Sequence, residues 1–429
     1  MDSKNKYHLE TIALHGGHTP DSDTLSRAVP IYQTSSYCFR NSEHAADLFG
    51  LKEAGHMYTR ISNPTTDVLE KRIAQMEGGV GAVAFSSGMA AITAAVLNIC
   101  KTGDHIVSSS SIYGGTGTLF GHTLPRLGIK TTLVDAGNAE NFAAAITDRT
   151  RLLYIETMGN PKNDVLDYDR IAEIAHEHKL PLFCDNTVAS PILFRPFEHG
   201  VDIVIHSCTK IIGGHGTAIG GVVVDSGKFD WASGDYPELT EPDDSYHGIV
   251  YTETFGKMAY IVKIRTQQMR DMGACLSPFN SFLLIQGLET IHLRVPRHCE
   301  NALALATWLE KQEQVAWVNY PGLKSHPDYK RAMKYLPCGQ GAILGFGIKG
   351  GKQAGVKFID SVKLASHLAN ILDSKTLVIH PASTTHQQLS EAGQAAAGVS
   401  ADYIRVSVGT EHIDDIIADF KQALNNSQR

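Results

Sequence analysis

Short apolar runs that stop abruptly at polar residues recur between residues 75 and 225. Each run has the length of a β-strand, and such runs are typical of the buried strands of an open α/β sheet. Apolar residues at helical spacing separate several of the runs, for example in 66–76, 90–100 and 171–179. This alternation predicts an α/β fold with a mostly parallel, doubly wound sheet of about seven strands. The expected strands are Gly81–Phe85, His105–Ser109, Lys130–Asp135, Arg151–Glu156, Leu180–Cys184, Val201–His206 and Gly216–Val224.

The pattern changes near residue 277. A helical segment is expected over 288–311, and Pro296 within it predicts a kink or a break, because proline lacks the N–H that a helix interior uses. We therefore expect a large domain over 61–276 and a smaller C-terminal α+β domain over 277–429. The strands expected in the second domain are Gly341–Lys349, Leu377–His380 and Tyr403–Gly409.

The first 60 residues contain no long periodic segment. An ordered, loop-rich arm of this length usually has something to pack against. Asn63-Pro64 then marks a turn and the start of the next helix. We therefore treat 1–60 as an N-terminal arm that precedes the large domain.

Two of the apolar runs end in residues suited to chemistry. Asp185 follows the run 180–184, and Lys210 follows the run 201–206 together with hydroxyl residues and a glycine-rich turn. Ligands of open α/β sheets bind outside the carboxyl ends of the strands. A lysine placed there can form a Schiff base with a phosphorylated aldehyde, while nearby hydroxyls and backbone amides take the phosphate. An aspartate on a neighbouring strand end would then pair with a pyridinium nitrogen.

A turn and a buried arginine add to this picture. The segment 86–89 joins an expected strand to an expected helix, a geometry that presents free N–H groups to a phosphate. Arg405 interrupts the apolar strand Tyr403–Gly409, and a buried arginine must find an anion or cost several kcal/mol. Its planar guanidinium suits an amino-acid carboxylate, although an internal salt bridge would satisfy it equally.

Composition excludes several other classes of protein. The 429 residues carry a formal net charge of −7, so no basic face for nucleic acid is expected. The seven cysteines form no CxxC pair, and the N-terminus has no apolar signal region, which together predict a cytoplasmic protein. No apolar run is long enough to cross a bilayer, and no HExxH motif indicates a metal. Nucleotide binding is disfavoured because neither G-x-G-x-x-G nor a Walker loop occurs.

The motifs DNTVASP (185–191), HSCTKIIGGHG (206–216) and the YTRxxNPT stretch from Tyr58 resemble one known family. They are similar to the Cys/Met-metabolism family of pyridoxal-phosphate-dependent transsulfuration enzymes, and most of all to its O-acetylhomoserine sulfhydrylase group. The resemblance covers nearly the whole chain. It implies an enzyme with the type I fold of PLP-dependent transferases and pyridoxal 5'-phosphate as the cofactor.

The resemblance also implies a role for individual residues. Lys210 would hold the cofactor and act as the base, Asp185 would face the ring nitrogen, and Tyr113 would lie over the ring and assist catalysis. The implied cofactor-binding set is Tyr58, Arg60, Ser87, Gly88, Met89, Tyr113, Asn160, Asp185, Thr187, Ser207, Thr209 and Lys210. The implied substrate-binding set is Arg405, Ser383, Asn160 and Tyr58.

Without the resemblance, plainer interpretations suit several of these residues. Tyr58 and Arg60 also fit an ordinary surface turn, and Tyr113 also fits a core tyrosine with a local hydrogen bond. In the family, the stretch with Tyr58 and Arg60 reaches into a neighbouring subunit, which implies a homo-oligomer, a tetramer with shared active sites. The Asn160-Pro161 pair is by itself a plain turn.

The reaction that the resemblance implies is a γ-replacement. O-acetyl-L-homoserine and sulfide, or a small thiol, would give L-homocysteine or methionine, with loss of acetate. Gly117 and Thr118 stand where close relatives carry a bulkier pair, and Gly115 argues against the γ-lyase branch. The alternatives are an O-succinylhomoserine sulfhydrylase, a methionine or homocysteine γ-lyase, and a catalytically silent scaffold that binds a partner.

Overall fold

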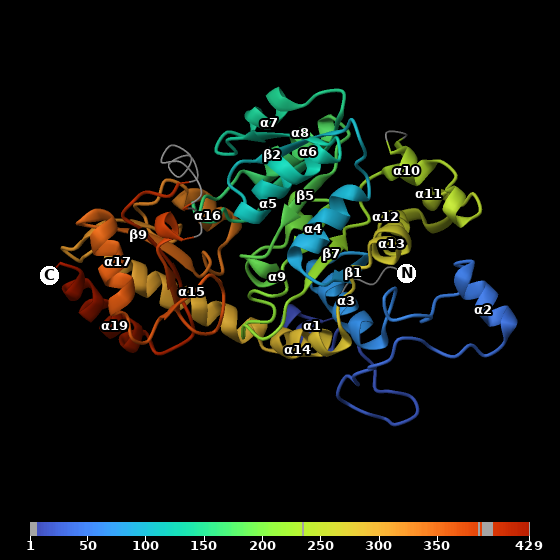
Figure 1. Cartoon of the computed structure of the whole chain (residues 1–429), viewed down its shortest axis with the longest axis horizontal. Coiled ribbons are helices and arrows are strands. Elements are labelled where there is room, and N and C mark those ends of the chain that lie inside the picture. The colour runs from blue at the N-terminus through green and yellow to red at the C-terminus, as the bar shows by residue number, and fades with distance from the viewer. Residues whose placement is uncertain (1–6, 234–235, 385–386, 388–397, 429) are drawn as a thin grey trace.

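A seven-stranded sheet lies at the centre of the computed structural model, which describes residues 7–233, 236–384, 387 and 398–428 (Figure 1). The strands β2 to β6 pair in parallel, whereas β7 runs antiparallel to both of its neighbours. The sheet predicted from the sequence is therefore confirmed. In spatial order its strands are β1 (Gly81–Phe85), β7 (Gly221–Asp225), β6 (Ile203–His206), β5 (Leu182–Asp185), β4 (Thr150–Glu156), β2 (His105–Ser109) and β3 (Lys130–Val134).

Both faces of this sheet are buried, which explains why its strands are apolar at nearly every position. Leu182 and Cys184 of β5 belong to one hydrophobic cluster, while Phe183 between them belongs to the cluster on the other face. The first cluster is covered by α3 (Pro64–Glu77), α8 (Tyr168–Glu177), α14 (Pro278–Glu289) and α15 (Ile291–Leu309). The second is covered by α4 (Gly88–Leu97), α12 (Ala259–Lys263) and the π-helix Ile264–Met269.

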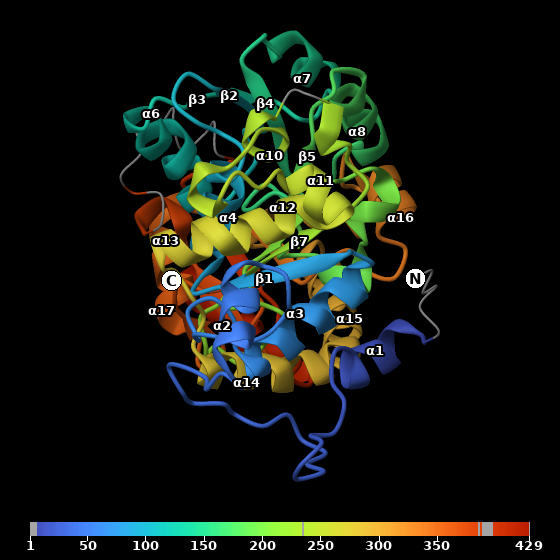
Figure 2. The ribbon, with the colours of Figure 1, turned by 90° about the vertical axis from the view of Figure 1, so that its right-hand side faces the viewer.

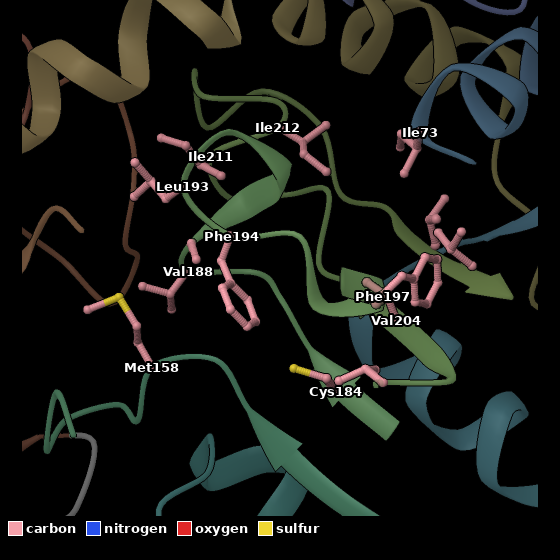
Figure 3. Close-up of a cluster of buried hydrophobic side chains, with 14 of the residues drawn as sticks. Ile73, Met158, Cys184, Val188, Leu193, Phe194, Phe197, Val204, Ile211 and Ile212 are labelled. Carbon is pink, nitrogen blue, oxygen red and sulfur yellow. The ribbon is translucent and has the colours of Figure 1, made fainter. Parts of the chain in front are cut away.

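Part of the first cluster is drawn in Figure 3. Cys184 of β5 and Val204 of β6 are partners in the sheet register, and both are fully buried. Val188 and Phe194, from the segment after β5, join the same cluster together with Ile211 from the segment after β6. Apolar packing therefore continues beneath the two polar segments that follow β5 and β6.

Local signals fix the helices that flank the first strand. The Asn63 side chain caps α3 by accepting the Thr65 N–H at 2.9 Å, and Pro64 occupies its first turn. The helix ends at Gly78, whose φ of 82° is the left-handed conformation that favours glycine. Ser87 caps α4 in the same way, accepting the Ala90 N–H at 3.1 Å. The helix start predicted at Asn63-Pro64 is confirmed.

A second, five-stranded sheet forms from the C-terminal part of the chain (Figure 1). Three of its strands were expected from the sequence, whereas the strands β8 and β10 were not. Helices α15, α17 (Gly351–Ser361) and α19 (Ile413–Ser427) contribute to its hydrophobic core. Helix α16 (Tyr329–Tyr335) lies between β8 and β9 in sequence. The strands in spatial order are β10 (Ser366–His367), β11 (Leu377–Ile379), β12 (Tyr403–Ser407), β9 (Ile343–Ile348) and β8 (Val315–Asn319).

Of the kink or break predicted at Pro296, the break does not occur there. Helix α15 continues through Pro296, and the interruption falls at Thr290, between α14 and α15. A proline removes one backbone hydrogen bond from a helix, and α15 retains this proline in its second turn, where Ile291, Val295 and Cys299 bury the same face. Tertiary packing outweighs the local preference here.

The N-terminal arm contains two short helices that the sequence pattern did not predict, α1 (Leu9–His15) and α2 (Ser42–Phe49). Helix α1 packs against α3 and α14. The stretch around α2 instead projects away from the sheet in Figure 1, and in Figure 2 it lies between the viewer and α3. Several large apolar side chains of the arm are exposed, among them Leu25 and Phe49. In the described part of the chain, no helix is both long and apolar enough to cross a membrane.

A buried acid at the end of β7 makes stability depend on pH. Burial raises the pKa of the Asp225 carboxyl to about 7, and its Oδ2 has no hydrogen-bond partner among the described residues. The folded chain therefore holds this proton above the unfolded value of 3.8, so stability is lost as the pH rises toward 7. Asp225→Asn keeps an oxygen for the Gly227 N–H and removes the buried charge.

We expect Asp225→Asn to increase the free energy of unfolding at pH 8 by about 2–4 kcal/mol, with the gain shrinking as the pH falls toward 4. Thermal unfolding of both proteins at pH 8, 6.5 and 5 measures this difference. Asp230→Asn, at an exposed site nearby, is the control and should show no such trend. An equal effect of Asp225→Asn at all three pH values would contradict the buried proton.

Candidate active site

The carboxyl ends of β4, β5 and β6 open into a cavity of about 330 Å³. Its wall combines the ends of these strands, the start of α4 and two segments of the C-terminal part, one of them around Asn370. Most of the residues expected at the site are thereby brought together. The expected residues that line the cavity are Ser87, Gly88, Met89, Tyr113, Asn160, Asp185, Thr187, Ser207, Thr209, Lys210 and Arg405.

Lys210 lies in the turn that follows β6. Its Nζ donates a hydrogen bond to Asn370 Oδ1 at 2.5 Å. Burial lowers the pKa of the Lys210 ammonium to about 8, and the Arg405 guanidinium acts in the same direction. A lysine with a pKa near neutrality supplies a free amine at little cost, which a nucleophile or a general base requires.

Asp185 ends β5 and is 9% exposed. Its Oδ1 accepts the Thr187 N–H at 2.9 Å. Burial raises the pKa of the Asp185 carboxyl, while hydrogen bonds from Thr187 and the charge of His206 oppose that rise. Donors directed at a carboxylate favour its ionised form, so the hydrogen bonds from Thr187 favour the ionised form of Asp185.

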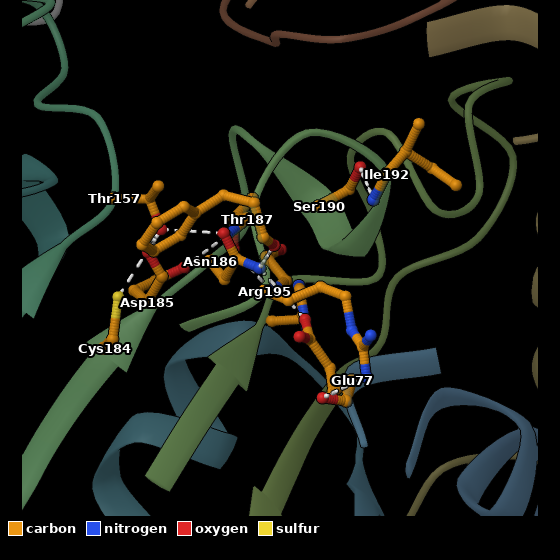
Figure 4. A network of polar contacts seen from close by, with 12 residues as sticks. Glu77, Thr157, Cys184, Asp185, Asn186, Thr187, Ser190, Ile192 and Arg195 are labelled. Carbon is orange, nitrogen blue, oxygen red and sulfur yellow. Dashed lines mark hydrogen bonds and ion pairs between the residues drawn. The ribbon is translucent and has the colours of Figure 1, made fainter. Parts of the chain in front are cut away.

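The segment after β5 is fixed from below by a buried polar network (Figure 4). Asn186 lies between Thr157, whose hydroxyl donates to Asn186 Oδ1 at 2.7 Å, and Glu77, which accepts from Asn186 Nδ2 at 3.0 Å. Glu77 Oε1 also lies 2.6 Å from His206 Nε2, and both of these side chains are fully buried. The network therefore joins α3, β4, β5 and β6 directly behind Asp185 and Lys210.

The turn before α4 packs closely against the segments that follow β6, at the wall of the cavity. Helix N-termini present unpaired N–H groups and a positive dipole end, which favour a phosphate. Gly88 allows a close approach here, because a Cβ on it would lie 2.7 Å from Ser207 Cβ. Gly221 is required for the same reason, because a Cβ there would lie 2.2 Å from the Ser87 carbonyl oxygen. Ser207 is thereby held beside the start of the helix.

Arg405 reaches the cavity from β12 of the second sheet. It is 9% exposed, and its guanidinium donates to Asn160 Oδ1 at 3.3 Å and to the Asn370 carbonyl oxygen at 3.2 Å. Within the described residues, no acidic side chain lies within ion-pair distance of it. The salt-bridge alternative therefore finds no acid there, and a buried cation facing a cavity is left for an anionic ligand.

Three expected residues do not line this cavity. Tyr58 is 44% exposed, and the Arg60 guanidinium lies 5.4 Å from the centre of its ring. Arg60 also donates to the Arg270 carbonyl oxygen. The Ser383 hydroxyl is hydrogen-bonded to His380 Nδ1 at 2.8 Å.

Two residues that the sequence analysis did not select are prominent in the cavity wall, Glu156 and Asn370. Glu156 ends an apolar strand as Asp185 does, so the same signal was present in the sequence. Asn370 lies in a segment without apolar periodicity, and no local pattern distinguishes it. Its importance is visible only once Lys210 and Arg405 are seen to contact it.

This arrangement fits a phosphorylated pyridine aldehyde. Lys210 offers an amine of lowered pKa, Asp185 offers a buried carboxyl, and the N-terminus of α4, with Ser87, Gly88 and Met89 in the cavity wall, is suited to a phosphate. No group of three or more His, Cys, Asp or Glu side chains in the described residues is arranged to hold a metal ion.

Comparison with known proteins identifies the family. A family model described as Cys/Met metabolism PLP-dependent enzyme matches residues 10–425. A homocysteine synthase of Schizosaccharomyces pombe is 56% identical over 420 residues, covering 97% of this chain and 98% of the relative. An O-acetyl-L-homoserine sulfhydrylase of Leptospira meyeri is 53% identical over 426 residues, covering 97% and 96%.

A solved structure extends the comparison to three dimensions. The crystal structure of an O-acetylhomoserine (thiol)-lyase from Campylobacter jejuni has a TM-score of 0.95 and 39% identity, and the match covers 98% of this chain and all of that chain. That protein carries a lysine modified by pyridoxal phosphate. Together with the cavity around Lys210, these matches show that the chain belongs to the Cys/Met-metabolism PLP-dependent enzymes and has the fold of this family, with pyridoxal phosphate as its cofactor.

Proposed function

We propose that the protein converts O-acetyl-L-homoserine and sulfide, or a small thiol, to L-homocysteine, or methionine, and acetate. The observation that carries this proposal is full-length similarity to enzymes of that activity at 50–56% identity. The cavity supports it independently, because Arg405 provides an unpaired buried cation for the α-carboxylate of an amino acid. Lys210 lies in the same cavity, beside Asn370.

The cofactor site is assigned from the side chains that meet in the cavity. Lys210 would hold the aldehyde carbon, and Asp185 would face the ring nitrogen and keep it protonated. The start of α4 (Ser87, Gly88 and Met89), with Ser207 and Thr209, would bind the phosphate. Thr187 and Tyr113 would lie on either side of the ring, and Asn160 would contact the ring hydroxyl and the substrate.

Bound pyridoxal phosphate supplies an electron sink for the α-carbon of the substrate. Lys210 then has two tasks, because protons must leave Cα and Cβ before the Cγ–O bond breaks. Its pKa of about 8 suits a base that is released and recaptured near neutral pH. Arg405 orients the substrate through the carboxylate, and Tyr113 assists the proton transfer. Acetate leaves from Cγ, and sulfide adds to the same carbon.

Tyr58 and Arg60 would complete the site of a neighbouring subunit. Both lie outside the cavity of their own chain, on an arm that projects from the sheet with exposed apolar side chains. We propose a homotetramer with shared active sites, in which 1–60 clasps a neighbour, 61–276 binds the cofactor and 277–429 closes over the substrate. We assign Ser383 to the substrate side through its neighbourhood, and the enzyme to the cytoplasm.

The acyl donor and the need for sulfide test the proposed reaction directly. We expect steady-state kcat/KM to be highest for O-acetylhomoserine, compared with the O-succinyl and O-phospho esters. The two cations that line the cavity, Lys210 and Arg405, are assigned to the cofactor and to the α-carboxylate, so neither is available to a second anionic group. Ester consumption without sulfide should be at least about 10-fold slower than with it. Rapid ammonia release without sulfide would instead identify a γ-lyase.

Lys210→Ala should abolish turnover, because the variant lacks the amine that binds the cofactor. For the same reason, borohydride should no longer fix the cofactor covalently to the chain. Absorption spectra before and after borohydride, followed by peptide mapping, measure this loss. Lys263 is a matched control, being a second buried lysine whose pKa burial lowers to about 8. Lys263→Met should retain the labelled Lys210 peptide. Near-normal sulfhydrylation by Lys210→Ala would overturn the assignment.

Arg60→Ala should weaken cofactor binding, and a mixture with Lys210→Ala should partly recover activity. If the two chains assemble at random in pairs, half of the pairs are mixed and each has one complete site. About a quarter of wild-type activity is then expected. Sulfhydrylase activity is measured after equal amounts of Arg60→Ala and Lys210→Ala are refolded together. Each variant refolded alone is the control. No recovery above the separate variants would exclude a shared site.

A further inference from the structure

Glu156 is a second acid in the wall of the cavity, beside Asp185. The two residues are register partners at the carboxyl ends of the parallel strands β4 and β5, so their side chains lie on the same face of the sheet. Glu156 is 5% exposed, and it lines the cavity. The proposed reaction gives this carboxyl no task.

Glu156 is bonded to the residue that carries Tyr113. Its Oε1 accepts the Tyr113 backbone N–H at 2.7 Å. The Tyr113 ring is about half exposed, and Gly115 leaves room for it, because a Cβ there would lie 2.5 Å from Tyr113 Cε1. The Tyr113 backbone is thus held through its N–H, which donates to Glu156, and through its carbonyl oxygen, which accepts the Gly117 N–H at 2.9 Å.

Two adjacent buried carboxylates repel one another, so one of them takes up a proton. Burial raises the pKa of Glu156 well above its usual range, and the charges of Asp185 and Asp164 add to this. Burial and the nearby acids raise the pKa of the Tyr154 hydroxyl, which is therefore neutral, and the cations Lys210 and Arg405 line the same cavity as the pair. Asp185 has Thr187 as a hydrogen-bond donor and the charge of His206 nearby, whereas Glu156 is opposed only by one backbone N–H.

We propose that Glu156 is a positioning residue that works as a neutral carboxylic acid. Its carbonyl oxygen holds Tyr113 over the cofactor ring, and its lack of charge leaves Asp185 as the single negative group beneath that ring. This inference rests on the placement of Tyr113 in the proposed function. It predicts that the hydrogen-bond acceptor of Glu156 matters and that its negative charge does not.

Two substitutions separate these properties. Glu156→Gln keeps the acceptor without a charge, and Glu156→Met keeps the volume and removes the acceptor. Each is made in the natural chain and in a Tyr113→Ala chain. The readouts on the holoenzyme without substrate are the visible circular dichroism of the bound cofactor and the pH at which its absorption band changes, with kcat and KM measured separately.

Glu156→Gln should match the natural enzyme within about 2-fold in kcat/KM, with an unchanged dichroism and transition pH. Glu156→Met should lose at least half of the dichroism and about 10-fold in kcat, because the Tyr113 N–H loses its acceptor and the ring moves. In the Tyr113→Ala chain, Glu156→Met should cause no further change in dichroism.

A Glu156→Gln enzyme as impaired as Glu156→Met would overturn the proposal, because the charge would then be required. An equal effect of Glu156→Met with and without the Tyr113 ring would overturn it as well. Unchanged dichroism in Tyr113→Ala would reject the placement of Tyr113, and this inference with it, while sulfide-dependent turnover would still support the reaction. If Glu156→Met does not fold, Glu156→Gln alone decides whether the charge is needed.

Discussion

The structure depends on burying a few charged groups at the edge of an otherwise apolar sheet. An isolated buried charge costs several kcal/mol, so each must find a partner or change its protonation. Lys210 responds with a pKa lowered to about 8, and Asp185 is retained by donors from Thr187. The same desolvation that would destabilise the fold therefore prepares the amine for chemistry. Glu77 and His206, fully buried behind the site, offset their cost by pairing with each other at 2.6 Å.

The central sheet could be predicted from the sequence because its strands are buried on both faces and hence apolar throughout. Gly81–Phe85 and His105–Ser109 have the predicted bounds, and the other strands differ by a few residues. The second sheet was harder, because β8 has one buried residue in five and β10 has two residues. A half-exposed or very short strand has too few buried apolar positions to give a recognisable alternation of apolar and polar residues. Helices α1 and α2 were not predicted for a similar reason, because they are only seven and eight residues long.

The site was predictable where chemistry and pattern coincide, and unpredictable where only distance in space matters. Asp185 and Lys210 each end an apolar run, so their juxtaposition follows from parallel strands that share an edge. Asn370 contacts Lys210 across 160 residues of sequence, and nothing near it in the chain reveals that contact. Pro296 shows the opposite case, since the break that a local rule allowed there does not occur and α15 continues through it. Tertiary contacts decide both cases.

The N-terminal arm exposes apolar side chains that the rest of its own chain does not cover. Leu25 and Phe49 are 76% and 62% exposed, and Tyr58 and Tyr113 are both about half exposed. Exposed apolar side chains gain about 25 cal/mol for each Å² that a partner covers. The cavity leaves Tyr113 half exposed, and the arm leaves its own apolar side chains exposed. Each could cover the other if they came from two copies of the chain. An assembly that satisfies both would bring Tyr58 and Arg60 to a catalytic centre built almost entirely by another copy of the chain.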